Sequence, residues 1–384
     1  MQITCKYFLI FFISLLAQQL TAASLGSDFF KETNVTQFVL KAPFTKMAEI
    51  KKNTLNFIEL KKYKFEGHIS YLLDQKNIDV PVEISIKGFT SAVYCKFPKL
   101  ELKIQNGKDS VFGGLKKIDL NTHCDDTLGS NKSDPFIISM SSPLREVVIY
   151  KIQEILGLKV LRTKPVQLTY VDTETGLSPE AAPKQIYDAF FIEDKSEFIK
   201  RNEMVEIKGV NDSFKSLDLA SGKTTVDQYQ FASVLDNSDK IDLMEAARIE
   251  LFQQVIFNND WFLKLNTNDL RHPQDTSDIS ELWNMRVFAE KENNKWFLLA
   301  QDFNFSALPM IQMMFEGASN APIQNKFFNQ ISVDQKNELI QQLQSQKQNI
   351  LSQLELVKND SEYLKMNRYL ENRIAFIINE LRKP

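Results

Sequence analysis

The chain is poor in histidine and carries no large excess of either charge, and both features exclude classes of protein. Its 384 residues include three histidines, and none has the helical spacing of a metal-binding pair. The formal net charge is −3, which provides no cationic field to attract nucleic acid. We therefore expect neither a zinc site nor a nucleic-acid partner.

Glycine-rich motifs and long apolar runs are also missing. The sequence contains no G-x-G-x-x-G phosphate loop and no G-x-S-x-G hydrolase motif. The apolar run at 7–16 follows Lys6 and is too short to span a bilayer, and no later stretch reaches about 18 apolar residues. With the small residues Thr21-Ala22-Ala23 behind it, this run predicts a signal peptide over 1–23. We expect an exported protein, periplasmic or extracellular, without a transmembrane segment after cleavage.

Only two cysteines remain in the mature chain, Cys95 and Cys124. Two predicted strands, at 96–104 and 116–121, flank a glycine-containing turn centred near residue 110. The cysteines lie equally far from that centre and would face each other across the hairpin. An exported compartment permits a disulfide, so we predict a Cys95–Cys124 bond; two free buried thiols are the alternative.

The first half of the chain has the alternation of an antiparallel sheet, and the second half is mainly helical. Strands are expected at 67–73, 80–86, 96–104, 116–121, 160–172 and 190–194. A helix should begin at Pro143 and end at Gly157, and another should run over 242–257. A strand hairpin is expected at 283–289 and 295–300, followed by long helices at 333–357 and 363–381.

These elements divide the chain into a sheet-rich lobe and a helical lobe, fold class α+β. The predicted segments after the signal peptide are a lead-in at 24–64, a sheet-rich lobe at 65–194, an insertion or loop at 195–240, a second lobe at 241–331 and a helical hairpin at 332–384. A nucleotide would fit naturally between the two lobes.

Two acidic segments in the second lobe occur in the order that phosphoryl-transfer enzymes use. Asp260 follows two asparagines, with Asn266 six residues further on, and Asp302 ends an apolar run two residues before Asn304. Kinases use one Asp to orient a hydroxyl, and an Asn and a second Asp to hold Mg²⁺. If the segments meet in space, they predict chemistry with ATP and Mg²⁺.

An ordered set of segments between about residues 80 and 310 resembles the kinase-like family named for the spore coat protein CotH. The resemblance is to an exported bacterial branch that shares the Cys-x-Phe-Pro and Thr-His-Cys segments. The segments that carry it are Gly114 to Asn121, Pro143-Leu144-Arg145-Glu146, Val166 to Val171, Phe191-Ile192-Glu193-Asp194, Asn259-Asp260-Trp261 and Asp302-Phe303-Asn304-Phe305.

The resemblance implies a two-lobed protein-kinase-like fold, with an antiparallel sheet N-lobe and a mainly helical C-lobe. It implies transfer of the ATP γ-phosphate to Ser or Thr hydroxyls of a protein partner. Asp260 would then be the catalytic base, and Asp302 would bind Mg²⁺ with oxygens from Asn266 and Asn304. The family usually has a second Asp where this chain has Asn304.

A kinase also needs a lysine paired with a helix carboxylate, and Glu146 is the expected carboxylate. Arg145 is a candidate for the phosphates, and Glu193 for a place near the adenine. We take Lys103 as the catalytic lysine and Lys117 as a cofactor contact. The sequence leaves open which lysine meets the phosphates, Lys99, Lys103 or Lys117.

Two other hypotheses about the function of this chain remain open. The Asn304 substitution and the scarcity of ATP outside cells favour a catalytically inactive secreted or surface binding protein. A glycoside hydrolase would instead need two carboxyl groups roughly 5–10 Å apart in an open groove.

Overall fold

The structure is a computed structural model. It describes residues 29–31, 36–54, 57–88, 91–92, 95, 97–124, 142–175, 186–207, 214–218, 223–226, 240–258, 285–292, 295–303, 306–311, 316–323 and 327–383. The predicted signal peptide and the predicted site residues Asp260, Asn266 and Asn304 lie outside these ranges. In the described segments, no helix combines the length and the apolar character needed to cross a bilayer.

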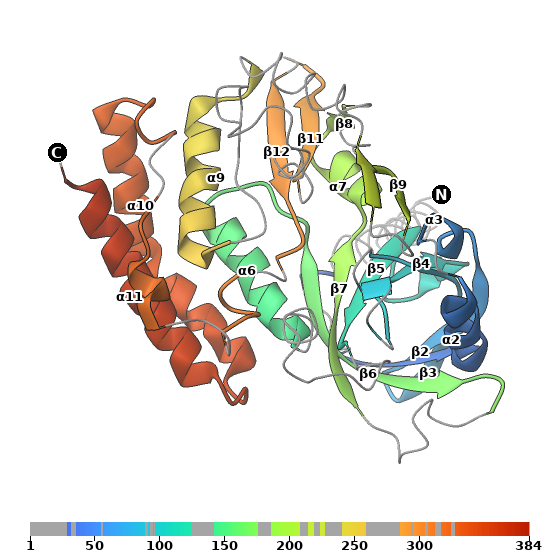
Figure 1. The fold of residues 1–384 in the computed structure, drawn as a ribbon. Helices are drawn as coiled ribbons and strands as arrows, with labels where there is room; N and C mark the ends of the chain where they lie inside the picture. Colours follow the sequence, from blue (N-terminus) through green and yellow to red (C-terminus); the bar gives the residue numbers. More distant parts are fainter. Residues whose placement is uncertain are drawn as a thin grey trace, which may run out of the picture.

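A closed β-barrel dominates the first half of the described chain (Figure 1). Its strands follow the order β1-β2-β3-β4-β5-β7-β6 around the barrel. They are β1 (Gln37–Ala42), β2 (Phe65–Leu73), β3 (Lys76–Ile86), β4 (Leu100–Ile104), β5 (Lys117–Thr122), β6 (Thr163–Asp172) and β7 (Tyr187–Glu193).

Strand β1 closes this barrel, and it comes from the segment predicted to lead into the fold. It pairs antiparallel with β2, where Leu40 faces Ile69, and parallel with β6, where Leu40 faces Tyr170. Closure leaves no unpaired sheet edge among these strands. The predicted two-lobed protein-kinase-like α+β fold, with an antiparallel sheet N-lobe and a mainly helical C-lobe, is therefore wrong. A closed barrel takes the place of the predicted N-lobe sheet.

The barrel interior is filled by aliphatic and aromatic side chains. Phe38 meets Phe191 edge-on, with ring centroids 5.2 Å apart, and Phe112 lies 6.1 Å from Phe191. Alternate residues of β4, Leu100 and Leu102, also point into this core. The residues between them therefore face outwards, towards the rest of the protein or solvent.

The second half of the chain surrounds another core, built mainly by helices (Figure 1). Helix α6 packs against β7 of the barrel and against the C-terminal helices, so it joins the two cores. The helices are α6 (Pro143–Ile155), α7 (Lys195–Arg201), α9 (Leu243–Ile256), α10 (Val333–Ser352), the short 3-10 helix η6 (Gln353–Val357) and α11 (Tyr363–Leu381); α2 (Phe44–Asn53) and α3 (Phe57–Leu60) lie beside the barrel.

A small sheet accompanies these helices, with the strand order β12-β11-β8. It consists of β8 (Met204–Glu206), β11 (Met285–Glu290) and β12 (Trp296–Ala300); a separate pair is formed by β9 (Phe214–Asp218) and β10 (Lys223–Val226). The predicted hairpin at 283–289 and 295–300 is confirmed by β11 and β12. The segment predicted as an insertion or loop contains α7 and β8, which attach it to the small sheet.

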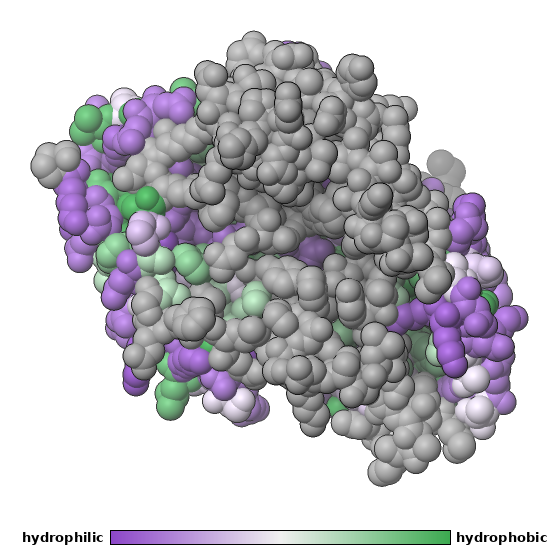
Figure 2. All heavy atoms as spheres, viewed as in Figure 1, coloured by the Kyte–Doolittle hydropathy of each residue, from purple (hydrophilic) through white to green (hydrophobic). Residues whose placement is uncertain are grey.

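Local sequence signals explain most element ends. Gly157 ends α6 with a φ of +77°, and Ser332 begins α10 in a reciprocal capping box with Gln335. The predicted C-terminal helical hairpin is confirmed: its inner side chains Leu339, Leu343, Ile350 and Leu354 are all buried. On the face shown in Figure 2, the described residues over α10 and α11 are mainly hydrophilic, with scattered hydrophobic ones.

The predicted disulfide is present. Cys95 and Cys124 are bonded, with Cα atoms 4.7 Å apart, and both are buried. The bond ties the segment before β4 to the residues that follow β5.

We expect the double variant Cys95→Ala/Cys124→Ala to lose roughly 3–4 kcal/mol of unfolding free energy, because the bond closes a loop with a sequence separation of 29. Urea unfolding of the oxidised wild type and the variant measures the loss. Reductant should destabilise the wild type to a similar extent and leave the variant unchanged; equal midpoints for all samples would contradict the prediction.

Candidate functional site

Three charged side chains from distant parts of the chain meet where the barrel adjoins α6. The Lys99 Nζ atom lies 3.1 Å from Asp302 Oδ1 and 3.8 Å from Glu146 Oε2. Lys99 and Glu146 are nearly enclosed, with 15% and 5% of their side chains exposed, whereas 41% of Asp302 is exposed. We call Lys99, Glu146 and Asp302 the Lys99 cluster.

The disulfide and an aromatic contact hold Lys99 in place. Phe97 stacks on Tyr170 of β6, with ring centroids 4.6 Å apart, and Cys95 is bonded to Cys124. The Lys87 backbone N–H also donates to the Lys99 carbonyl over 2.7 Å. Because Leu100 and Leu102 point into the barrel core, alternation directs the preceding residue, Lys99, away from the barrel interior.

Gly88 passes over Lys99 in a backbone conformation that favours glycine. Its φ is +77°, and a Cβ atom there would lie 3.5 Å from Lys99 Cβ and would collide with Ser91 Oγ. The segment that begins at Lys87 and Gly88 therefore lies beside the Lys99 cluster. Phe89 and Thr90 lie outside the described residues.

Glu146 belongs to the first turn of α6, which Pro143 starts. Its Oε2 accepts a hydrogen bond from Asn121 Nδ2 of β5 at 3.4 Å, while Oε1 is buried without a hydrogen-bond partner among the described residues. Burial raises the pKa of Glu146, and the nearby Lys99 ammonium only partly offsets it. The carboxylate is thus oriented towards Lys99 from both the barrel and the helix.

Asp302 follows β12, in a left-handed backbone conformation with a φ of +59°. Its backbone N–H donates to the Tyr150 hydroxyl of α6 at 3.3 Å. The next residue, Phe303, is completely buried and meets Phe252 of α9 edge-on at 5.4 Å. A buried aromatic anchor therefore presents the preceding carboxylate to Lys99.

The electrostatics of the cluster favour a charged lysine. Burial disfavours the Lys99 ammonium, but the carboxylates of Asp302 and Glu146 outweigh this effect and raise the pKa of Lys99. The ammonium therefore stays protonated at neutral pH. One cation held between two carboxylates, with one of them accessible, suits a site that receives an anionic ligand together with a metal ion.

A second group of carboxylates lies on the same outer side of the barrel. Oxygens of Glu101, Asp119 and Asp194 lie within 4.8 Å of one another and could hold a cation. Lys87 is hydrogen-bonded to Asp119, and Lys117 Nζ lies 3.3 Å from Glu101 Oε1. Asp194 accepts from the Ser196 backbone at the start of α7, so each of the three carboxylates has a partner within the fold.

The lysines chosen from the sequence do not join the Lys99 cluster. Lys103 forms a 3.8 Å ion pair with Glu83 and is 55% exposed, and Lys117 pairs with Glu101. Of the three candidate lysines, Lys99 is the one that the structure places beside Glu146 and Asp302. The Phe97-Pro98 pair is the sequence feature that could have singled out Lys99. A buried aromatic residue close to a disulfide restricts the position of the chain just after it.

Arg145 and Glu193 are held in ion pairs within the fold. Arg145 Nη2 lies 2.7 Å from Asp360 Oδ1, and its Nη1 donates to the Pro309 carbonyl. The buried Glu193 carboxylate lies 2.7 Å from both Arg162 and Arg201. Both groups are thus engaged by charged or polar partners within the fold, which explains their burial.

The end of α9, which precedes Asp260, lies beside the loop that follows Asp302. The Ala307 backbone N–H donates to the Ile256 carbonyl over 2.8 Å, which joins the loop after Asp302 to the end of α9. Asn258, two residues before Asp260, is buried at this end of the helix. The chain therefore enters the Asp260 segment next to the loop that carries Asp302.

Searches against protein-family models and against curated proteins found no match to this chain.

Proposed function

We propose that this chain is an exported, CotH-like protein kinase that transfers the γ-phosphate of ATP to Ser or Thr hydroxyls with Mg²⁺. The single observation that supports this is the Lys99 cluster, one buried lysine held between a helix carboxylate and an accessible carboxylate after a strand. Protein kinases rely on the same three charges for the nucleotide phosphates and their metal. The proposal rests on these side chains and not on a kinase-like fold.

Each member of the cluster has a separate role in the proposed reaction. Lys99 binds phosphate oxygens, and Glu146, oriented by Asn121, keeps the lysine in position. Asp302 is the residue that would hold Mg²⁺, since its carboxylate offers the hard oxygens that this ion prefers and is partly accessible. When bound, the ion neutralises charge on the phosphates.

Asp260 completes the proposal as the residue that orients the hydroxyl of the protein substrate. The link between Ala307 and Ile256 supports this role, because it brings the start of the Asp260 segment beside the Asp302 loop. Asn266 and Asn304 remain proposed metal contacts. The Cys95–Cys124 disulfide supports the proposed export, since oxidising compartments outside the cytosol maintain such bonds.

A second candidate function is nucleotide-dependent binding without phosphate transfer. Asn304 favours it, because an amide at the position of a second aspartate removes one negative charge from the proposed metal site. In that case ATP binding would alter the surface offered to a protein partner, and no phosphate would move.

Binding and transfer can be separated with purified mature protein. We expect Mg·ATP to raise the melting temperature of the wild type, and ATP with EDTA to raise it less. Asp302→Ala should abolish this dependence on Mg²⁺, while Asp334→Asn, an exposed aspartate in the first turn of α10, should behave like the wild type.

Transfer is then followed with γ-labelled ATP and a generic protein substrate. Label on Ser or Thr that disappears in Asp260→Asn supports the kinase. Binding without label in the wild type supports the second candidate. If Mg·ATP does not change the melting temperature of the wild type, both candidate functions are contradicted.

A further inference from the structure

A cavity of about 210 Å³ lies between helix α2 and the barrel, lined by a different set of residues from the Lys99 cluster. Its walls come from α2, from the end of β3, from the start of β4 and from β6. Most of the lining is apolar and buried, including Met47, Ile86, Leu100 and Tyr170. The exposed residues Thr45 and Ala48 mark its opening along α2.

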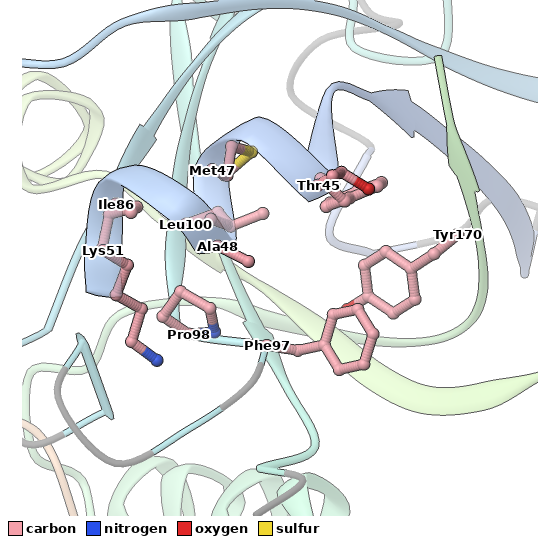
Figure 3. A pocket seen from close by; sticks show the side chains of 10 residues that line it. Thr45, Met47, Ala48, Lys51, Ile86, Phe97, Pro98, Leu100 and Tyr170 are labelled. Atoms are coloured by element: carbon pink, nitrogen blue, oxygen red, sulfur yellow. The ribbon is translucent and has the colours of Figure 1, made fainter. Parts of the chain in front are cut away.

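One side of the cavity is a flat aromatic wall. Phe97 and Tyr170 stack with their ring planes 19° apart, and Phe44 meets Tyr170 edge-on at 5.2 Å. Figure 3 shows these two stacked rings together on one side. The Tyr170 hydroxyl is hydrogen-bonded to Thr122, so its polar atom is already satisfied within the barrel. An aliphatic chain would therefore meet an apolar surface here.

The opposite side carries a lysine. In Figure 3, Lys51 extends from α2 beside Pro98, across the cavity from Tyr170. Its ammonium donates to the Cys95 carbonyl, and no described carboxylate forms an ion pair with it. Burial lowers the pKa of Lys51 to about 8, so the group is still mostly cationic at pH 7. An ammonium has three donors, which leaves capacity for a further acceptor.

We infer that this cavity binds a small amphipathic carboxylate, with its chain against Phe97 and Tyr170 and its carboxylate on Lys51. An apolar cavity with one charged group at its edge selects for such a ligand, because the chain buries apolar surface while the head group gains an ion pair. The carboxylate also supplies the opposite charge that the half-buried ammonium lacks within the described fold.

The cavity volume limits the size of the ligand. An apolar protein cavity of about 150 Å³ accommodates benzene, so about 210 Å³ should take roughly eight to ten non-hydrogen atoms. Octanoate has this size and the required charge, and octan-1-ol is a matched neutral probe. A long-chain fatty acid would have to leave part of its chain outside.

Titration calorimetry on the full mature chain with its disulfide intact tests this inference. We expect octanoate to bind the wild type with at least tenfold higher affinity than octan-1-ol. Lys51→Met keeps an unbranched side chain without the charge and should lower octanoate affinity at least tenfold while leaving octanol affinity unchanged. Lys52→Met removes the same charge from an exposed neighbour on α2 and should bind octanoate like the wild type.

A second variant reports on the cavity itself. Ala48→Phe at the exposed rim should weaken octanoate and octanol together, because the larger ring occupies the opening. Circular dichroism and melting temperature establish that each variant is folded. Equal octanoate binding by the wild type and Lys51→Met, or binding unaffected by Ala48→Phe, would overturn the inference, as would the absence of any octanoate binding to the wild type.

Discussion

Replacing Lys99 with methionine should reduce phosphate transfer roughly 100- to 1,000-fold, the loss typical of removing one preorganised electrostatic group from an active site. The ammonium lies 3.1 Å from Asp302 and 3.8 Å from Glu146, and its loss removes the cation that we propose binds the phosphates. It also leaves two neighbouring carboxylates without their shared partner. Initial rates with labelled ATP, and Mg·ATP affinity by calorimetry, measure the effect.

Lys103→Met is the matched control for this experiment. Lys103 lies on β4, four residues further along the chain, but it is 55% exposed and pairs with Glu83. We expect its removal to change the rate less than twofold and the unfolding free energy by under about 1 kcal/mol. If Lys103→Met impairs transfer and Lys99→Met does not, the original choice of lysine was right and the Lys99 cluster is not the phosphate site.

The largest loss of stability should come from Arg145→Met, at about 3–5 kcal/mol, because breaking a buried ion pair leaves a charge without a partner. Only 3% of the Arg145 side chain and 12% of Asp360 are exposed, and two guanidinium nitrogens donate to this carboxylate at 2.7 and 2.8 Å. Urea unfolding at pH 7 gives the loss. Arg382→Met, at an exposed arginine, should change little.

The Arg145–Asp360 ion pair also predicts how the free energy of unfolding depends on pH. Burial disfavours the Asp360 carboxylate, but hydrogen bonds led by that from Arg145 outweigh it and lower the pKa of this carboxyl. A lowered folded-state pKa contributes stability that is fully present above the unfolded value of about 3.9 and is lost as pH falls through the folded value. Arg145→Met should therefore be less sensitive than the wild type to acid below about pH 4.

A double variant distinguishes the effect of the two charges from the effect of side-chain packing around Arg145. Arg145→Met/Asp360→Leu removes both charges, and it should recover much of the stability lost in Arg145→Met. If the double variant is as unstable as the single one, packing around Arg145 matters more than its charge.

Much of the local structure could be predicted from the sequence. The alternation in β3, the Pro143 start of α6 and the apolar seam of α10 each depend on residues that are close in the chain. The Cys95–Cys124 pair was also predictable, because two strands joined by a short turn bring residues equidistant from the turn together. Glu146 was expected to pair with a lysine, but that lysine is Lys99 and not Lys103, and Asp302 lies beside it as well.

The closure of the barrel was not predictable in this way. Strand β1 is six residues long, and its inward residues Phe38, Leu40 and Ala42 lie in a Lys-rich stretch with weak periodicity. Its partners are β2, across two short helices, and β6, about 130 residues away. No local pattern encodes a pairing at that distance. The sequence therefore predicted an antiparallel sheet without β1, and the closure into a barrel was missed.

The sequence by itself predicted many of the strands and helices, the pairing of the cysteines and the candidate acidic residues, but not β1, α2 or α7. Only the tertiary structure shows which lysine, Lys99 or Lys103, lies beside Glu146 and Asp302. Both lysines occupy outward positions around β4, and a two-residue period assigns them to the same face. What lies opposite each differs: α6 and the loop after β12 bring Glu146 and Asp302 to Lys99, whereas Lys103 stays largely in solvent beside Glu83. That choice depends on long-range packing, because the partner charges come from residues about 50 and 200 positions further along the chain.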